Sequence, residues 1–499
     1  MLHATESMSS HAGQQNGEGA EDSVLPGESA RLLGEPDSIY SSDEDNCEPP
    51  PRSWADIKSL LAFALPMALT RGGQGAMQQT NVMFVGHLGT HELGSAALGN
   101  LWATVTGRSV YLGSLSALDT LASQAFGAKS FKHIGTLTQR AVLMQTLICI
   151  PIGCCWAFFT KPVLTAAGID PEQAAMAQDY SRILALGLWP EVMVCIIESF
   201  LQVQGITHAP MVVTFVAAVC NVGLNFVLVY GVGGQDGLGF IGSPICMVII
   251  NWSTFFALLL WVRCAGLHEK CWDGWSVWAL RDWCVMIKLG LSGIAAVMGE
   301  WWAWEISTGF AGNLGAVPLA AHASLQNLTF YYYMPMTGFM QAATVRVGNA
   351  LGAGRAKRAW EEVKTASLVV FLFELLLYVL SLFVLREKLA ALYSSDPIVI
   401  EVATTALLPY LTHNLLDGVN GVLQAALRGC GRQQTTAKVS IFTWYVVALP
   451  LAFVLCFNAG LGVVGVWIGL MVGAWTTCIV QGFILKRLDW EAETQKAQK

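Results

Sequence analysis

Charged residues are scarce in this sequence. Of its 499 residues only 13% are charged, whereas 54% are hydrophobic, and the mean hydropathy is +0.50. Soluble globular proteins carry a charge at about 25% of their positions. The shortage therefore excludes an ordinary soluble protein of this length and indicates that lipid is the main solvent of the folded chain.

The motifs of metal sites and enzymes are also missing. The thirteen cysteines show no Cys-x-x-Cys spacing, and most of them stand singly in apolar stretches. No phosphate-binding loop, zinc-ligand spacing or nucleophile with an ordered base is present. We therefore expect no disulfide framework, no metal, no cofactor, no enzyme activity and no nucleic-acid partner.

Much of the negative charge lies in residues 1–50. Eleven acidic residues and one basic residue, Arg31, occur there, although the whole chain has a net charge of only −7. A segment this polar buries too little apolar surface to fold, so we predict a disordered acidic tail in the cytosol. Within it, Glu28–Leu33 reads Glu-Ser-Ala-Arg-Leu-Leu, which is either a signal that binds a sorting adaptor or a chance match.

Apolar stretches long enough to cross a bilayer recur along the chain. A helix needs about 20 residues to cross about 30 Å of hydrocarbon, and helices satisfy their own backbone hydrogen bonds there. The twelve stretches are 57–85, 93–121, 136–158, 180–203, 209–230, 239–263, 283–312, 318–341, 363–386, 399–425, 436–457 and 462–484. We therefore predict an all-α integral membrane protein with twelve transmembrane helices.

Basic residues in the loops lie mainly on one side of these stretches. With the N-terminus inside, the inner loops and the C-terminus hold nineteen lysines and arginines, whereas the outer loops hold four. Loops rich in lysine and arginine stay in the cytosol, so both termini are predicted to be cytosolic. The sequence leaves open whether the membrane is the plasma membrane or that of a vacuole or lysosome.

The chain repeats itself at an offset of about 222–226 residues. Gly86-His-Leu-Gly89 corresponds to Gly312-Asn-Leu-Gly315, and Leu201-Gln corresponds to Leu423-Gln. Six helices return the chain to its starting side, so two pseudo-symmetric six-helix lobes are related by an axis along the membrane normal. The predicted parts after the tail are an N-terminal lobe at 51–263, a cytosolic linker at 264–282, a C-terminal lobe at 283–485 and a cytosolic C-terminus at 486–499.

Five motifs are distributed along the predicted helices and loops. They read Phe84-Val-Gly-His-Leu-Gly89, Asp119-Thr-Leu-Ala-Ser-Gln-Ala-Phe-Gly-Ala-Lys129, Gly299-Glu-Trp-Trp-Ala-Trp-Glu305, Val345-Arg-Val-Gly-Asn-Ala-Leu-Gly-Ala-Gly354 and Arg428-Gly-Cys-Gly-Arg-Gln433. In this order they resemble the eukaryotic branch of the multidrug and toxic compound extrusion (MATE) family. The resemblance implies a secondary antiporter that exports organic, cationic and amphipathic compounds in exchange for protons, and we expect it to be monomeric.

Acidic residues inside the predicted helices are the candidates for ion coupling. On insertion scales such an acid costs about 2.5–3.5 kcal/mol unless it has a partner, a proton or water, and it can bind either a proton or a cation. The resemblance aligns Glu300 with the family's coupling carboxylate and pairs it with Asp417. Glu305 lies about 140° around the helix from Glu300, and we expect either a site role or structural hydrogen bonds for it. For Glu374 a structural role is favoured.

Aromatic and amide side chains are the candidates for substrate binding. Aromatic rings beside a carboxylate suit a flat or cationic organic ligand, and amides and phenols suit a polar site within an apolar helix. The predicted substrate-binding residues are Trp301, Trp304, Asn327, Tyr333, Gln74 and Gln78. The tyrosine run at 331–333 has packing as its alternative role.

The first predicted helix lacks the aspartate that the resemblance associates with bacterial proton-coupled relatives. It carries Arg71 instead, and Arg108 stands in the second predicted helix. In one interpretation these arginines pair with Glu198, Glu191 or Asp119, which the cost of an unpaired charge in the membrane favours. In the other they line the central cavity and admit anionic substrates.

Other functions stay open on this sequence. A lipid-linked precursor flippase has the same two-lobe architecture but needs a strongly cationic cavity, for which Arg71 and Arg108 are the only hint. A sodium-coupled or anion-preferring exporter keeps the same architecture with a different ion or cargo. A channel or receptor is disfavoured, because the repeat of one half in the other favours alternating access.

Overall fold

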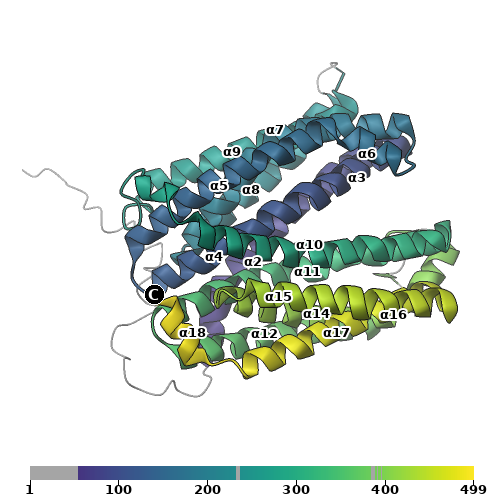
Figure 1. The fold of residues 1–499 in the computed structure, drawn as a ribbon. Helices are drawn as coiled ribbons and strands as arrows, with labels where there is room; N and C mark the ends of the chain where they lie inside the picture. Colours follow the sequence, from purple (N-terminus) through teal and green to yellow (C-terminus); the bar gives the residue numbers. More distant parts are fainter. Residues whose placement is uncertain (1–53, 232–235, 384–387, 390–391, 395, 499) are drawn as a thin grey trace, which may run out of the picture. The chain divides into compact units, whose positions relative to one another are not determined.

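The computed structural model describes residues 54–231, 236–383, 388–389, 392–394 and 396–498 (Figure 1). The predicted tail at 1–50, with the sorting motif Glu28–Leu33, lies outside the described residues. The described residues between 54 and 498 belong to one compact unit by their internal contacts. The exact boundaries of the two lobes and of the linker between them therefore stay predictions.

The N-terminal half is helical throughout its described part, apart from short loops. Its elements are α2 (Trp54–Gly86), α3 (Thr90–Ala103), the π-helical turn η2 (Thr104–Arg108), α4 (Ser109–Gly127), α5 (Phe131–Phe158), α6 (Thr160–Ala166), α7 (Pro171–Val203), α8 (His208–Asn225), η3 (Phe226–Tyr230), η4 (Gly239–Ile241) and α9 (Gly242–Cys264). The turn η2 continues α3 into α4, and these three elements together carry the predicted second span.

The C-terminal half follows the same plan. Its elements are η5 (Val277–Leu280), α10 (Trp283–Asn313), α11 (Ala316–Gly352), α12 (Ala356–Phe383), α14 (Pro397–Gly429), α15 (Gln433–Phe442), η6 (Thr443–Ala448), α16 (Leu449–Phe453), η7 (Val454–Asn458), α17 (Gly462–Lys486) and α18 (Trp490–Ala497). Here α15, η6, α16 and η7 form the predicted eleventh span. Within the described residues each predicted span therefore falls on helix, with 384–386 of the ninth span lying outside them, and the all-α membrane fold is confirmed.

Two of the long helices begin with the same local signal. At the start of α7, the Asp170 side chain accepts hydrogen bonds from the backbone N–H groups of Glu172 and Gln173, at 3.0 and 3.2 Å. Asp396 caps α14 in the same way by accepting from Ile398 at 2.9 Å. In both helices a proline follows the cap, where its missing N–H costs nothing, so these starts are encoded locally.

Eight helices of the described chain are long and apolar enough to cross a membrane by length and composition. The helix α2, the pair α3 and α4, and the helices α11 and α14 do not meet that measure, although sequence reasoning predicted them as spans. They carry more polar residues, and they contact one another: α11 packs against α2 and α4, and α14 against α11 and α4. The helices with more polar residues are therefore the ones that pack against one another.

The contacts inside one half are repeated in the other. In the first half α5 packs on α7, α7 on α9, α4 on α5 and α2 on α8; in the second half α12 packs on α14, α14 on α17, α11 on α12 and α10 on α15. Between the halves, α10 contacts α4 and α11 contacts α2, an exchange that a two-fold axis produces. Figure 1 shows α5, α7 and α9 together, and α14 and α17 together. The two halves are therefore pseudo-symmetric lobes, called the N-lobe and the C-lobe below.

The lobes meet closely where α4, α11 and α14 end, a region called the closed end below. A Cβ atom at Gly348 would collide with Ser123 Oγ, and one at Gly127 would collide with the carbonyl oxygen of Asn349. Gly352 has the same relation to the backbone of α4. Only glycine allows two helix backbones to approach this closely, so α4 and α11 seal this end by backbone contact.

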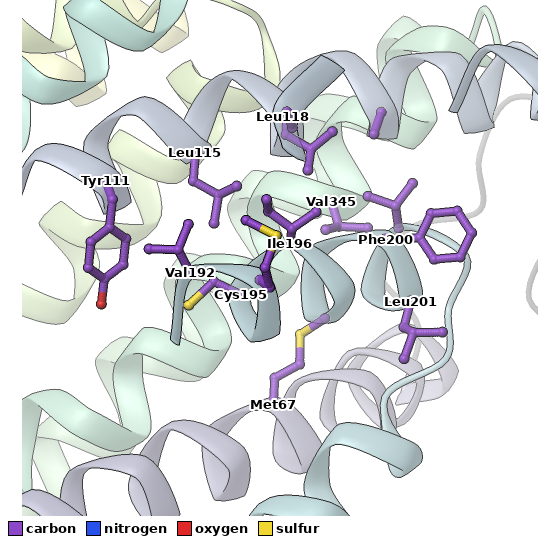
Figure 2. Packing of buried hydrophobic residues seen from close by; sticks show 14 of the residues in the cluster. Met67, Tyr111, Leu115, Leu118, Val192, Cys195, Ile196, Phe200, Leu201 and Val345 are labelled. Carbon is purple, nitrogen blue, oxygen red and sulfur yellow. The ribbon is translucent and has the colours of Figure 1, made fainter. Parts of the chain in front are cut away.

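The largest buried cluster extends across the two lobes. Figure 2 shows Leu115 and Leu118 of α4 facing Ile196 of α7, with Val345 of α11 close by. All four side chains are 6% exposed or less. Because Val345 belongs to the C-lobe, the core of the N-lobe is completed by a helix of its partner lobe, which explains why contacts do not divide the two.

The segment between the lobes and the last helix both pack on the bundle. Gln139 of α5 donates a hydrogen bond to Gly274 O at 2.7 Å and accepts one from Ser276 N at 2.8 Å. The helix α18 is tied by the ion pair of Arg432 with Glu493, at 2.6 Å. Both segments are therefore fixed to the helix bundle by side-chain contacts.

Candidate functional site

Glu300 of α10 faces α14. Its Oε2 accepts a hydrogen bond from Gln424 Nε2 at 3.3 Å. The Asp417 carboxyl and the Arg428 guanidinium, both on α14, lie within electrostatic range of it. The structure thus brings together Glu300 and Asp417, which sequence reasoning predicted as the coupling pair.

A third acid, Glu374 of α12, lies within electrostatic range of Asp417. Asp417 is buried, with 6% of the residue exposed, and Glu374 of α12 is 4% exposed. Glu374 Oε1 accepts a hydrogen bond from the backbone N–H of Gly418 at 2.9 Å, which agrees with the structural role expected for it. Within the described residues no lysine or arginine forms an ion pair with Glu300, Glu374 or Asp417. These three residues are called the acidic cluster below.

Tyr333 of α11 joins the acidic cluster from a third side. This half-buried phenol interacts electrostatically with Glu300, Asp417 and Arg428. Of the predicted substrate-binding residues, Tyr333 is therefore the one that lies beside the acids. A phenol next to carboxylates can donate a hydrogen bond to either of them.

Sequence reasoning missed Gln424 and Arg428 as parts of this site. Arg428 was counted among the basic residues of an inner loop, and Gln424 was noted only as part of the repeat. A signal was present, because Asp417, Gln424 and Arg428 recur at spacings of seven and four residues. Such spacings place side chains on one face of a helix.

The other predicted residues of α10 and α11 lie elsewhere. Trp304 packs in an aromatic group, with its ring centroid 5.2 Å from His413 and 5.8 Å from Trp467. Glu305 and Asn327 are exposed, and neither makes a hydrogen bond or ion pair with another described residue. Trp301 is half-buried. The geometry therefore gives Trp304 a packing role, whereas the other three keep their predicted roles untested.

Arg71 and Arg108 are both paired with acids, as the first interpretation requires. Arg71 Nη1 lies 3.3 Å from Glu198 Oε2, and Glu198 is fully buried. Gln74 completes this network, because it accepts a hydrogen bond from Arg71 at 2.9 Å and donates one to Glu198 at 2.7 Å. The predicted substrate ligand Gln74 is thus engaged in an ion-pair network, whereas Gln78 is exposed.

The second N-lobe pair has a similar environment. Arg108 Nε lies 3.3 Å from Glu191 Oε1. Tyr111 donates a hydrogen bond to the same oxygen at 2.7 Å, and Asn251 donates one to Glu191 Oε2 at 3.4 Å. Asp119, the third acid considered for pairing, accepts a hydrogen bond from Ser199 at 2.5 Å instead. Each of these acids therefore has an ion-pair or hydrogen-bond partner within the N-lobe.

The repeat makes the contrast between the lobes specific. Gln74 and Glu300 correspond at an offset of 226 residues. In the N-lobe the amide of Gln74 on α2 contacts the carboxylate of Glu198 on α7. In the C-lobe the two groups are exchanged, because the carboxylate of Glu300 on α10 contacts the amide of Gln424 on α14. Among the described residues an arginine lies within ion-pair distance of Glu198 but not of Glu300, so of these two corresponding arrangements the C-lobe one has the acid without a counterion.

One exposed group of the described residues has the side chains of a metal site. His91, Asp170 and Glu172 each offer a ligand atom, and these atoms lie within 4.8 Å of one another. Sequence reasoning expected no metal site. The Asp170 carboxylate already caps α7, which explains its position without a metal.

An all-helical membrane bundle of two related lobes, with acids held between the helices of one lobe, defines a membrane transporter. A sequence profile of the MatE family matches residues 66–227 and 294–454, and the chain belongs to this family. The resemblance to eukaryotic MATE transporters is therefore confirmed, and the protein is a multi-pass membrane transporter rather than an enzyme.

Known proteins resemble this chain over most of its length. Multidrug and toxin extrusion protein 1 of Homo sapiens is 32% identical over 477 residues, covering 95% of this chain and 82% of that protein. The protein of the same name from Mus musculus is 33% identical over 448 residues, covering 89% and 77%. The crystal structure of the eukaryotic MATE transporter AtDTX14 matches with a TM-score of 0.82 at 26% identity, covering 89% of this chain and 98% of that one.

Proposed function

We propose that the protein exports organic, cationic and amphipathic compounds in exchange for protons. The relatives named above are multidrug and toxin extrusion proteins, which supports export as the direction. The observation that carries the coupling is the acidic cluster, whose three acids have no ion-pair partner among the described residues, whereas the N-lobe acids Glu191 and Glu198 are paired with arginines. An acid without a counterion can be neutralised by a proton or by a cationic substrate, but not by both.

In this proposal Glu300 is the exchange group and Asp417 tunes it. Two carboxylates that share one site repel each other, so one of them readily takes up a positive charge. Glu300 is partly exposed and Asp417 is buried, so cargo reaches Glu300 first. Tyr333 and the half-buried Trp301 complete a surface that suits an aromatic or cationic ligand. Trp304, by its packing, is left out of this surface.

We further propose that the closed end faces the cytosol. It includes the loops at 128–130, 353–355 and 430–432, and the distribution of lysine and arginine assigns these loops to the cytosol. The described state then represents a transporter sealed toward the cytosol, in which the acidic cluster awaits protons from the other side. Rocking of the two lobes about the crossing of α4 and α11 exchanges access.

The alternatives from the sequence fare differently. An anion-preferring exporter or a lipid-linked precursor flippase needs free positive charge in the cavity, but Arg71 and Arg108 are each paired with an acid, which disfavours both. A sodium-coupled exporter uses the same acids, so only ion substitution separates it from a proton-coupled one. A monomeric state and a sorting adaptor for Glu28–Leu33 stay predictions.

The test is transport by the purified protein in liposomes. A pH gradient is imposed, and sodium is varied separately, while uptake of a labelled organic cation and a labelled organic anion is measured. We expect uptake of the cation to follow the pH gradient and to fall at least tenfold in Glu300→Gln. Glu401→Gln is the matched control, because Glu401 is an exposed acid on α14. Full pH-driven uptake by the Glu300→Gln protein would remove Glu300 from the coupling role.

A further inference from the structure

A small cavity lies between Glu300 and the closed end. Its volume is about 20 Å³, and its wall is formed by α4, α10, α14 and α15, so both lobes contribute to it. Ala296 and Val297 line it about one helical turn before Glu300, and Gln424 lines it too. Because Gln424 also donates a hydrogen bond to Glu300, this residue joins the cavity to the acidic cluster.

Three residues of the cavity wall carry a buried polar atom that has no hydrogen-bond partner among the described residues. These atoms are Arg428 Nε, Gln433 Oε1 and Thr436 Oγ1. Buried polar atoms are nearly always satisfied by protein or by ordered water. A water molecule needs about 10–15 Å³ and two to four polar partners. The cavity meets both conditions, with a donor on Arg428, an acceptor on Gln433 and a hydroxyl on Thr436.

The same residues hold the lobes together at the closed end. Gln433 Nε2 donates to Thr120 Oγ1 of the N-lobe at 2.7 Å, and Thr120 Oγ1 donates to the carbonyl oxygen of Arg428 at 2.8 Å. Gln124 Nε2 donates to Gly429 O at 2.9 Å. These three bonds between α4 and the junction of α14 and α15 are called the inter-lobe seal below. Gln433 is fully buried, so its amide cannot exchange these partners for bulk water while the seal is closed.

We propose that the cavity binds an ordered water, and that Gln424, Arg428 and Gln433 use it to transmit the charge of Glu300 to the inter-lobe seal. The inference rests on the proposed function, because it assumes that Glu300 changes its charge during transport. The carboxylate of Glu300 holds the Gln424 amide and attracts Arg428. These two side chains then position the water, and the water holds the Gln433 oxygen, so that the Gln433 nitrogen points at Thr120.

Neutralising Glu300 weakens its interactions with Gln424 and Arg428, which are the first step of this proposed link. The charged and titratable groups around it are Asp417 and Arg428 on α14 and Tyr333 on α11, with Glu374 of α12 behind Asp417. Once a proton or cation neutralises Glu300, Gln424 and Arg428 are free to turn toward the remaining acids, and the water and Gln433 lose their fixed partners. The seal then opens only when Glu300 is occupied, which is the condition for exchange without leakage.

The test is hydrogen–deuterium exchange of the full-length protein in lipid nanodiscs, at one pH. The amides followed are those of residues 428–434 and of the end of α4. Glu300→Gln imitates the neutral acid, Gln433→Leu removes the link, and Thr120→Val removes its N-lobe partner. We expect exchange at least threefold faster than in the unchanged protein for all three. Gln434→Leu, an exposed neighbour on the same helix, is the control and is expected to leave exchange unchanged.

A second variant tests the water itself. Ala296→Val fills the cavity without removing any polar group, so displacement of the water is its main effect. We expect it to speed exchange of the same amides and to let substrate leak from liposomes without a pH gradient. Normal exchange and no leak in this variant would show that no water is needed there. Thermal unfolding of every variant identifies loss of fold, and Thr120→Val gives the answer if Gln433→Leu does not fold.

The outcomes separate this inference from the proposed function. If Glu300→Gln abolishes pH-driven transport but leaves the exchange of the seal amides unchanged, the function stands and the link is wrong. If Glu300→Gln transports normally, the proposed function fails, whatever the exchange shows. In the double variant of Glu300→Gln and Gln433→Leu, effects of one link are expected not to add, because coupled residues show non-additive changes. Full additivity would contradict the link.

Discussion

Glu374 accepts a hydrogen bond from the backbone N–H of Gly418 at 2.9 Å, and Gly418 directly follows Asp417 in the chain. One oxygen of this buried acid is thus bound by a helix backbone rather than by a cation, while its Oε2 has no hydrogen-bond partner among the described residues. The close approach needs a glycine, because a Cβ at position 418 would collide with Glu374 Oε1. The packing of α12 on α14 and the position of Asp417 therefore depend on the same contact.

We expect Gly418→Ala to destabilise the protein by about 1–3 kcal/mol, the usual effect of overpacking a buried contact. Transport is expected to fall as well, because Asp417 shifts with the backbone. The measurements are thermal unfolding in detergent and uptake in liposomes. Gly153→Ala is the control, since nothing lies within 4 Å of a Cβ built there. An unfolding temperature equal to that of the control would show that Glu374 and α12 move aside at no cost in stability.

The buried pair of Arg71 and Glu198 gives a second prediction. Arg71→Met leaves a fully buried carboxylate without its partner, which is expected to cost about 3–5 kcal/mol. The double variant of Arg71→Met and Glu198→Gln removes both charges, so we expect it to recover most of that loss. Both are checked by thermal unfolding. Equal losses in the single and the double variant would mean that the pair is not the source of the effect.

The helices could be predicted from the sequence because each is a local property. A run of about 20 apolar residues must be a helix in lipid, and Asp170 and Asp396 mark helix starts by their own side chains. The repeat was also visible in the sequence, in pairs such as Gly86 with Gly312. What could not be predicted is which side chains meet between helices. The contact of Gln424 with Glu300 depends on how α10 and α14 are rotated against each other, and rotation is set by packing.

The same limit applies to Trp304. Glu300 and Asp417 could be chosen because an acid in a membrane helix is costly wherever it points. Trp304 stands four residues after Glu300, about 40° around the helix, and sequence alone places it beside the acid. Its ring instead packs against His413 and Trp467. Only the position of α14 and α17 decides between these two environments.

The C-terminal helix α18 gives a pH-dependent prediction. Burial of the Glu493 side chain raises its pKa, but hydrogen bonds from Arg432 and Lys496 outweigh burial, so the pKa of Glu493 lies below its usual 4.5. Since the folded pKa is depressed, the pair stabilises the docked helix fully above about pH 4.5, and the stabilisation is lost as the pH falls through the lower value.

We therefore expect Glu493→Gln to weaken docking of α18 at pH 7 by about 1 kcal/mol, which is roughly a fivefold change in local opening. The difference between this variant and the unchanged protein should shrink as the pH falls through the lowered pKa of Glu493. Deuterium exchange of residues 490–497, compared between the two proteins at each pH, measures it. A difference that stays the same as the pH is lowered would assign the effect to packing rather than to charge.

The crossing of α4 and α11 provides a test of closure. In Gly348→Ala the new methyl group meets Ser123 Oγ, so the lobes can no longer approach fully at the closed end. We expect a several-fold loss of transport with little change in unfolding temperature, because the contact is between lobes. Ser123→Gly in the same chain makes room again and is expected to restore transport. If it does not, the loss comes from α11 itself.

Trp304 separates a packing role from a binding role. The residue lies in a cluster with His413, Trp444 and Trp467, with its ring 6.3 Å from that of Trp444, so Trp304→Ala leaves a cavity in the C-lobe core. Truncations of this kind cost about 3–5 kcal/mol, and we expect a marked fall in unfolding temperature with the KM for organic cations unchanged in the protein that folds. Trp301→Ala is the matched comparison, because Trp301 is half-buried and directly follows Glu300. It should raise the KM and leave the unfolding temperature nearly unchanged. The reverse pattern would return Trp304 to the binding surface and exclude Trp301 from it.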